Sequence, residues 1–386
     1  MSGRSAWSTG PAGELRARGL GIPFDGTPGP LNAVTDVQGV EVGYATLIEG
    51  EGPLIVGQGP VRTGVTALLP LGRGALGATV AAGWFSLNGN GEMTGTTWIE
   101  ECGGLDVPVA ITNTHAVGPV HRGVIEWVTR EQPSLAGRWL LPVVAETWDG
   151  YLNDVNGRHV LPETAVAALD AARAAALLEG SVGGGAGMNC YGYKGGTGTA
   201  SRVLQVGQES YTVGALLQAN FGSRAELTIA GVRMGPSLMF DNPMQERTDA
   251  EPPGAGSCIV IVATDAPLLP GQCKALARRV PLGLARTGTT GSHFSGDIFL
   301  AFSTANAGML DSGPGADGLA VRSMSFLPWG ALDSVYEAVV QVVEEATVNA
   351  LVAGRTMVGR DGHRTPGLPL DRVLTLLHGA GRAPAG

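Results

Sequence analysis

The sequence predicts a layered α/β (α+β) fold around a large core. Short apolar and β-branched runs, typical of strands, are interleaved along the chain with segments whose apolar residues recur at helical spacing. Hydrophobic residues make up 44% of the 386 residues and charged residues only 15%, which is the composition of a globular protein. The 61 glycines follow no collagen-like period, so they indicate tight turns and close backbone approaches.

The N-terminal part of the chain predicts an arm followed by strands. Residues 1–30 are rich in Gly, Pro and Ser, so we expect a loose arm ahead of a single domain over residues 31–386. Pro108 and Pro142 lie inside two of the apolar runs and indicate strand starts or edges. The expected strands cover residues 34–42, 64–69, 77–85, 105–112 and 140–145.

Helical patterns lie between and after these strands. Pro162 precedes one such segment and Gly180 follows it, and both residue types commonly mark helix boundaries. The expected helices cover residues 119–130, 163–179, 267–279 and 331–353, the last with the clearest apolar face. Two glycine-rich stretches predict loops at residues 183–198 and 311–318.

Charge and cysteine content exclude several kinds of partner. The formal net charge is −9 and no Lys/Arg cluster appears, which argues against nucleic-acid binding. The four cysteines lie far apart and form no Cys-x-x-Cys pair, so we expect reduced thiols in a cytoplasmic protein without a metal site. Neither a signal-peptide core nor a run of ~20 apolar residues appears, so no membrane partner is expected.

The composition of the chain changes sharply at Ser257. Residues 242–256 are polar and Pro-rich, and Ser257 then opens the strongly apolar run 258–263. A flexible segment therefore leads directly into a buried strand. Because Gly-Ser pairs are common, the residues alone favour an ordinary surface loop before a core strand.

The same junction also meets the needs of a nucleophile at a new N-terminus. A serine hydroxyl is weak until a base takes its proton, and a freed α-amine, with a usual pKa of about 7.7–8.0, is such a base. Gly256 permits strained backbone dihedrals at the bond to be cut. The strand after Ser257 would hold the nucleophile on a rigid element.

A resemblance to a known family decides between these two interpretations. Residues 256–268 (GSCIVIVATDAPL) resemble the processing site of the DmpA/BapA family, the L-aminopeptidase D-amidase/D-esterases and β-aminopeptidases of peptidase family S58, which are of N-terminal-nucleophile type. Other blocks agree in order over about residues 31–370. They are LNAVTDV (31–37), NGNGEMTG (88–95), AETWDGYLND (145–154), QANFG (218–222), SGDIFLAFSTAN (295–306) and GRDGH (359–363).

The resemblance implies a fold and a maturation step. The fold is a four-layer α/β/β/α sandwich, similar to Ntn hydrolases in architecture but different in connectivity, as in the DmpA/ornithine acetyltransferase type. The catalytic domain is expected to cleave itself into an α fragment, 1–256, and a β fragment, 257–386, which stay associated. The unit is expected to form a homo-oligomer, with a tetramer favoured. No cofactor and no metal are expected.

The resemblance also implies which residues carry the chemistry. Ser257 is the expected nucleophile, with its own α-amine as base. Ser295 is expected to hydrogen-bond that amine and Asp297 to orient Ser295, although some relatives carry Glu at the acidic position. Their spacing of two puts both on one face of an extended segment. Asn220 matches the asparagine that stabilises the oxyanion.

Three further residues are expected to bind the substrate. Glu146 matches a carboxylate that pairs with the free amino group of the substrate. Trp148 and Tyr151 are expected to form pocket walls. Some relatives have a tyrosine near the position of Trp148 that helps to hold the oxyanion, so this chain departs from the family there. The loop 88–95 is expected to border the cleft.

These assignments predict a metal-independent serine aminopeptidase. It would hydrolyse N-terminal residues from small peptides, amides or esters through an acyl-enzyme on Ser257. An acyltransferase of related fold is one alternative, although such enzymes use a threonine nucleophile. A non-catalytic binding protein that retains the fold is the other. The choice among L-, D- and β-amino acid substrates stays open.

Overall fold

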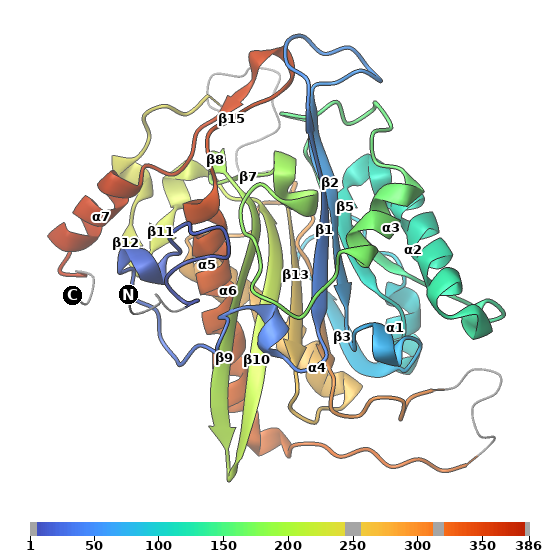
Figure 1. Ribbon diagram of the computed structural model, residues 1–386. Helices are drawn as coiled ribbons and strands as arrows, with labels where there is room; N and C mark the ends of the chain where they lie inside the picture. Colours follow the sequence, from blue (N-terminus) through green and yellow to red (C-terminus); the bar gives the residue numbers. More distant parts are fainter. Residues whose placement is uncertain (1–5, 244–255, 312–319, 383–386) are drawn as a thin grey trace.

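The computed structural model describes residues 6–243, 256–311 and 320–382 (Figure 1). Two β-sheets lie face to face in the middle of the molecule, and helices cover the outer face of each sheet. This is the expected four-layer α/β/β/α sandwich, and the prediction of the fold class is confirmed. Within the described residues no helix is both long and apolar enough to cross a bilayer.

The larger sheet has six strands in the order β4-β3-β14-β13-β10-β9. β13 lies in its interior, parallel to β14 and antiparallel to β10. Val, Ile and Ala dominate β13, which is buried along its whole length, as expected for a strand covered on both faces. The strands are β3 (Val80–Ser86), β4 (Gly104–Leu105), β9 (Gly196–Val206), β10 (Glu209–Asn220), β13 (Ser257–Thr264) and β14 (Ile298–Ser303).

The smaller sheet has four strands in the order β1-β2-β5-β6. β5 and β6 run parallel, so their ends meet at one edge of the sheet. The strands are β1 (Glu41–Glu49), β2 (Val61–Leu69), β5 (Val109–Asn113) and β6 (Val143–Thr147). Short strand pairs lie outside the two sheets: β7 (Asn189–Cys190) with β8 (Tyr193–Lys194), β11 (Thr228–Ile229) with β12 (Val232–Arg233), and β15 (Met357–Val358) with β16 (Arg364–Thr365).

Three apolar cores fill the spaces between the four layers. One core joins α4, α5 and α6 to the larger sheet, one lies between the sheets, and one joins α2 and α3 to the smaller sheet. The helices are α1 (Thr96–Cys102), α2 (Val117–Glu131), α3 (Pro162–Asp170), α4 (Pro270–Ala277), α5 (Val280–Arg286), α6 (Asp333–Ala353) and α7 (Leu370–Gly379). Short 3-10 turns span Arg18–Leu20, Val34–Asp36, Arg73–Ala75, Thr114–Ala116, Pro133–Leu135, Gly183–Gly187, Arg224–Glu226, Gly235–Ser237, Trp329–Ala331 and Arg360–Gly362.

Several predicted elements were wrong in extent. The strand expected at 34–42 begins only at Glu41, because the Asp36 carboxylate accepts the N–H groups of Leu31 (2.9 Å) and Ala33 (3.2 Å) and turns the chain. The helix expected over 163–179 ends at Asp170, and the following backbone pairs with β1 instead. The loop expected at 183–198 contains a 3-10 turn, β7, β8 and the start of β9.

The N-terminal segment was expected to be loose, but residues 6–30 dock on the domain. Ala17 and Ile22 are buried in the core between the helices and the larger sheet. The buried Arg16 guanidinium pairs with Glu179 at 2.7 Å. Composition could not show this, because the partner lies 163 residues further along the chain. Residues 1–5, 244–255 and 312–319 lie outside the described residues, and with them most of segment 242–256 and of loop 311–318.

Candidate active site

The candidate site lies where β10 and β13 end beside each other. Asn220, the last residue of β10, is the register partner of Ser257, the first residue of β13. Cys258 packs in the core on the helix side of the sheet, whereas Ile259 packs between the two sheets. Because side chains alternate along a strand, Ser257 belongs to the inter-sheet face, where only 3% of it is exposed.

Gly256 brings the chain into this position through a backbone conformation that other residues rarely adopt. Its φ is +151°, and a Cβ there would lie 1.9 Å from the carbonyl oxygen of Asn220. Gly256 forms a parallel bridge with Ser295, in which the Gly256 carbonyl accepts the N–H of Gly296 at 3.0 Å. The bridge sets the Gly256–Ser257 bond beside the segment that carries Ser295.

Ser295 and Asp297 form a buried hydrogen-bonded pair. The Ser295 hydroxyl donates to Asp297 Oδ1 at 2.7 Å, and both residues are at most 3% exposed. Burial raises the pKa of Asp297, while hydrogen bonds from Ser295 and Asn88 oppose the rise. Because the hydroxyl hydrogen is used by the carboxylate, the lone pairs of Ser295 Oγ are free to accept a neighbouring N–H group.

Asn220 presents its side-chain amide in a fixed orientation. Its Oδ1 accepts the backbone N–H of Asn189 at 2.8 Å, and its Nδ2 donates to the carbonyl of Trp148 at 2.8 Å. An amide nitrogen carries two hydrogens, so the second one is available to a developing oxyanion.

Glu146 lies near the end of β6 and is buried. Its carboxylate accepts the hydroxyl of Thr114 and, at 3.0 Å, the backbone N–H of Glu92. Burial raises the pKa of Glu146, while these two hydrogen bonds oppose the rise. Gly91, in loop 88–95, lies close to both Glu146 and the Ser295 segment. A Cβ added to Gly91 would lie 3.2 Å from Glu146 Oε1 and 2.8 Å from Gly296 Cα. The loop therefore lies between Glu146 and the Ser295 segment.

Trp148 and Tyr151 are placed by different neighbours. The Trp148 carbonyl contacts Asn220 directly, and its ring meets the His115 ring edge-on at 5.5 Å. The Tyr151 ring stacks on His363 at 4.8 Å, and its hydroxyl donates to the Arg364 carbonyl at 3.4 Å. The structure therefore brings Trp148 to the group around Asn220, whereas segment 363–364 positions Tyr151.

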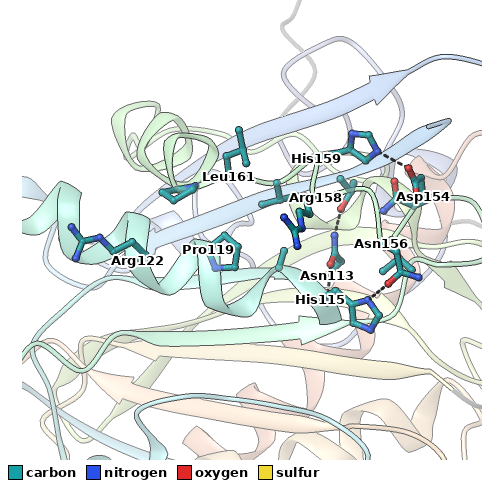
Figure 2. Close-up of a pocket in the computed structure, with 15 residues that line it drawn as sticks. Asn113, His115, Pro119, Arg122, Asp154, Asn156, Arg158, His159 and Leu161 are labelled. Carbon is teal, nitrogen blue, oxygen red and sulfur yellow. Dashed lines mark hydrogen bonds and ion pairs between the residues drawn. The ribbon is translucent and has the colours of Figure 1, made fainter. Parts of the chain in front are cut away.

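A cavity of about 670 Å³ opens over the start of α2 (Figure 2). Its wall includes His115, which contacts the Trp148 ring. His115 is hydrogen-bonded to Asn156 and His159 to Asp154, while the Arg158 side chain projects among them. None of the residues predicted to be catalytic lines this cavity, so it is a hollow adjacent to the candidate site and separate from Ser257.

Several residues that position this group had no role predicted from the sequence. Asn88 binds Asp297, and Asn189 binds Asn220. Lys194 is completely buried, and its Nζ donates to the carbonyls of Gly185 (3.3 Å), Met188 (2.8 Å) and Gly195 (3.0 Å). Burial lowers the pKa of Lys194 to about 7. Only Asn88 lay in a loop already expected to border the cleft; the other contacts join segments without a local motif.

Comparisons with known proteins find similarity over most of the chain. The model of peptidase family S58 matches residues 32–365. The β-peptidyl aminopeptidase BapA of Sphingosinicella microcystinivorans is 50% identical over 370 residues, covering 94% of this chain and 91% of the relative.

Two solved structures are also similar over nearly their whole length. The L-aminopeptidase D-Ala-esterase/amidase of Ochrobactrum anthropi, described as a prototype for the serine aminopeptidases and a variant of the Ntn hydrolase fold, superposes with a TM-score of 0.88. It is 45% identical, covering 95% of this chain and 99% of that one. A β-aminopeptidase of Burkholderia sp. has a TM-score of 0.86 and 44% identity, with the same coverage.

Proposed function

The chain belongs to peptidase family S58 and is a serine aminopeptidase of the Ntn type, and from this premise we propose that Ser257 is its nucleophile, exposed when the chain cleaves its own Gly256–Ser257 bond. The observation that carries the proposal is the position of Ser257 at the start of a rigid buried strand, opposite Asn220 and next to the bridge between Gly256 and Ser295.

Maturation in this proposal is an acyl shift followed by hydrolysis. Ser257 Oγ attacks the Gly256 carbonyl carbon, the peptide C–N bond breaks, and the hydroxyl proton ends on the released α-amine of Ser257. Water then hydrolyses the ester, which restores the hydroxyl and leaves Gly256 with a carboxylate. No co-reactant other than water is required.

Turnover uses the same oxygen with a different base. The free α-amine takes the proton from Ser257 Oγ as this oxygen attacks the substrate carbonyl, and it later protonates the leaving amine. Ser295, held by Asp297, accepts a hydrogen bond from that amine and fixes its direction. The free N–H of the Asn220 amide stabilises the oxyanion.

Glu146 is the proposed anchor for the ammonium group of the substrate. A buried carboxylate favours a paired cation over a neutral group, and Glu146 already lies beside the loop that contacts Gly296. The proposed substrates are small peptides, amides or esters with a free N-terminal amine. Because the 50% identical relative is a β-peptidyl aminopeptidase, peptides that begin with a β-amino acid belong in this class.

The proposed domain is a single catalytic unit whose two fragments, 1–256 and 257–386, stay associated. β13 and β14 of the second fragment lie between β10 and β3 of the first, so separation would break two strand ladders. We include a homo-oligomer and a cytoplasmic location in the proposal. Exposed Trp139 and Trp329 suit self-association, and the four free cysteines suit a reducing compartment.

Intact mass spectrometry tests the proposal. The wild-type protein should give two fragments, one of which begins at Ser257, and Ser257→Ala should give one uncut chain without activity. Ser292→Ala removes a hydroxyl three positions before Ser295 and should behave as wild type. A panel of L-, D- and β-aminoacyl nitroanilides then defines the substrate. Full activity in a chain whose 256–257 bond is intact would refute the proposal.

A further inference from the structure

We propose that the backbone N–H of Gly296 is the oxyanion donor of the self-cleavage step, separate from Asn220, which serves substrate turnover. The inference rests on the proposed function, because it concerns the step that creates the N-terminal nucleophile. It assigns a catalytic part to a backbone group that carries no side chain.

The donor already points at the atom that would become negative. In the uncut chain the Gly296 N–H donates to the Gly256 carbonyl oxygen at 3.0 Å. The other bond of the same bridge, from the Gly256 N–H to the Phe294 carbonyl, is longer, at 3.5 Å. A donor that is in place before the reaction needs no reorganisation when charge develops on the oxygen.

Gly296 is also held rigidly. A Cβ at this position would lie 2.4 Å from the Asn90 carbonyl oxygen and 2.6 Å from Gly91 Cα, so loop 88–95 presses directly on its backbone. The residues on either side of Gly296 are linked by the hydrogen bond from the Ser295 hydroxyl to the Asp297 carboxylate. The Gly296 N–H therefore cannot follow a carbonyl that moves away, and this rigidity is the property that an oxyanion donor needs.

Gly256 is fixed from the opposite direction. With φ at +151°, its α-carbon faces the Asn220 carbonyl so closely that only glycine fits. The scissile carbonyl is thus confined between the end of β10 and the Ser295 segment. Both partners of the hydrogen bond are immobile in the uncut chain.

The movement of electrons shows that the Gly296 N–H acts in self-cleavage, when the Gly256 carbonyl is attacked. When Ser257 Oγ bonds to the Gly256 carbon, the carbonyl π pair moves onto the oxygen that Gly296 holds, and the hydrogen bond becomes charge-assisted. Collapse of this intermediate expels the Ser257 nitrogen, which takes up the proton. Asn220 has a different attachment: its amide is oriented by Asn189 and Trp148 and does not depend on Gly256.

An amide-to-ester substitution tests the inference without adding atoms. Gly296→glycolic acid, introduced by nonsense suppression in cell-free translation, replaces the N–H by an oxygen. Self-cleavage, followed by intact mass, should slow by about 10²- to 10³-fold, the usual loss for one oxyanion donor. The fraction that has been cleaved should hydrolyse its substrate with a kcat within about threefold of wild type.

Gly308→glycolic acid is the matched control. Its N–H donates to the Thr79 carbonyl at 2.8 Å, which is the same kind of bond outside the site, so this ester should cleave as fast as wild type. Equal cleavage rates for the two esters would overturn the inference and leave the proposed function standing. A kcat loss as large as the cleavage loss would overturn the separation of roles. A wild-type chain that stays uncut would instead refute the proposed function.

Discussion

Asn88 binds Asp297 through both ends of its side-chain amide. Its Nδ2 donates to Asp297 Oδ2 at 2.8 Å, and its Oδ1 accepts the backbone N–H of Asp297 at 2.6 Å. The other carboxylate oxygen, Oδ1, accepts the Ser295 hydroxyl. Asn88 therefore fixes the carboxylate that fixes Ser295, across 209 residues of sequence.

Asn88→Ala should slow both self-cleavage and turnover. The loss of hydrogen bonds to a buried charged group costs about 1.5–3 kcal/mol, which corresponds to roughly a 10- to 100-fold lower rate if the Ser295 hydroxyl is no longer held in place. KM should change little, because Asn88 acts through Asp297 and not on the substrate. Cleavage half-lives and steady-state kinetics measure the two effects.

Asn90→Ala is the control on the same loop, since the exposed Asn90 side chain donates to the Phe294 carbonyl and, among the described residues, has no hydrogen bond to Asp297 or Ser295. It should keep wild-type rates. A rise in KM without a fall in kcat for Asn88→Ala would mean that Asn88 shapes the substrate site and does not position Ser295.

Glu146→Gln should separate substrate binding from self-cleavage. If Glu146 pairs with the substrate ammonium, loss of its charge should lower kcat/KM by about 10²-fold or more, mainly through KM. Self-cleavage should keep its wild-type rate, because the Ser257 nitrogen is still an amide in the uncut chain. The exposed neighbour Glu92→Gln is the matched charge control. Arrest of self-cleavage in a folded Glu146→Gln protein would contradict the ammonium role.

The parts of the fold that the sequence could predict are those with strong local patterns. The apolar run after Ser257 became β13, and the apolar face over 331–353 became α6, because burial of such patterns needs no distant information. The helix over 163–179 could not be bounded, since its apolar pattern continues while Arg173 exchanges two backbone hydrogen bonds with Val42 of β1. The docking of residues 6–30 likewise depends on distant partners.

In the candidate site, too, some features follow from local sequence and others depend on contacts between distant segments. Ser257, Ser295 and Asn220 lie in recognisable sequence blocks, and the structure places them where strands end side by side. Asn88 and Gly296 lie in such blocks as well, but the blocks did not indicate the roles inferred for them. Each depends on a contact between segments that only the folded chain brings together.

Lys194→Met should lower kcat through Asn220. Lys194 ties down the carbonyls of Gly185 and Met188, and the next residue, Asn189, holds the Asn220 side chain. Release of this loop should reduce kcat about 10-fold and leave KM nearly unchanged, because Asn220, the proposed oxyanion donor, loses its fixed direction. Lys274→Met, at a half-buried lysine that pairs with Glu100, is the control for removing a lysine.

A double mutant separates this positioning role from a general loss of stability. If Lys194 acts through Asn220, then Lys194→Met should reduce kcat much less in an Asn220→Ala background than in wild type. Equal kcat losses in the two backgrounds would show that Lys194 only stabilises the fold. Circular dichroism of each variant verifies that the protein compared is folded.

The unfolding free energy of Asp149→Asn relative to that of wild type should increase as pH rises. Burial raises the pKa of Asp149 to about 7, although side-chain hydrogen bonds from Thr63, Asn153 and Asn113 oppose the rise. The pKa of an aspartate in an unfolded chain is about 3.9. Between these values the folded chain holds a proton that the unfolded chain lacks. The stability that Asp149 contributes is therefore complete below about pH 4 and is lost as pH rises through 7.

Asparagine keeps the shape without this titration, so the unfolding free energy of the variant minus that of wild type should increase from pH 5 to pH 8. Urea unfolding, with the Ser257→Ala change in both proteins to keep one chain, measures it, and Asp25→Asn, at an exposed carboxylate, controls for net charge. A difference that stays constant with pH would show that Asp149 is ionised in the folded protein throughout this range.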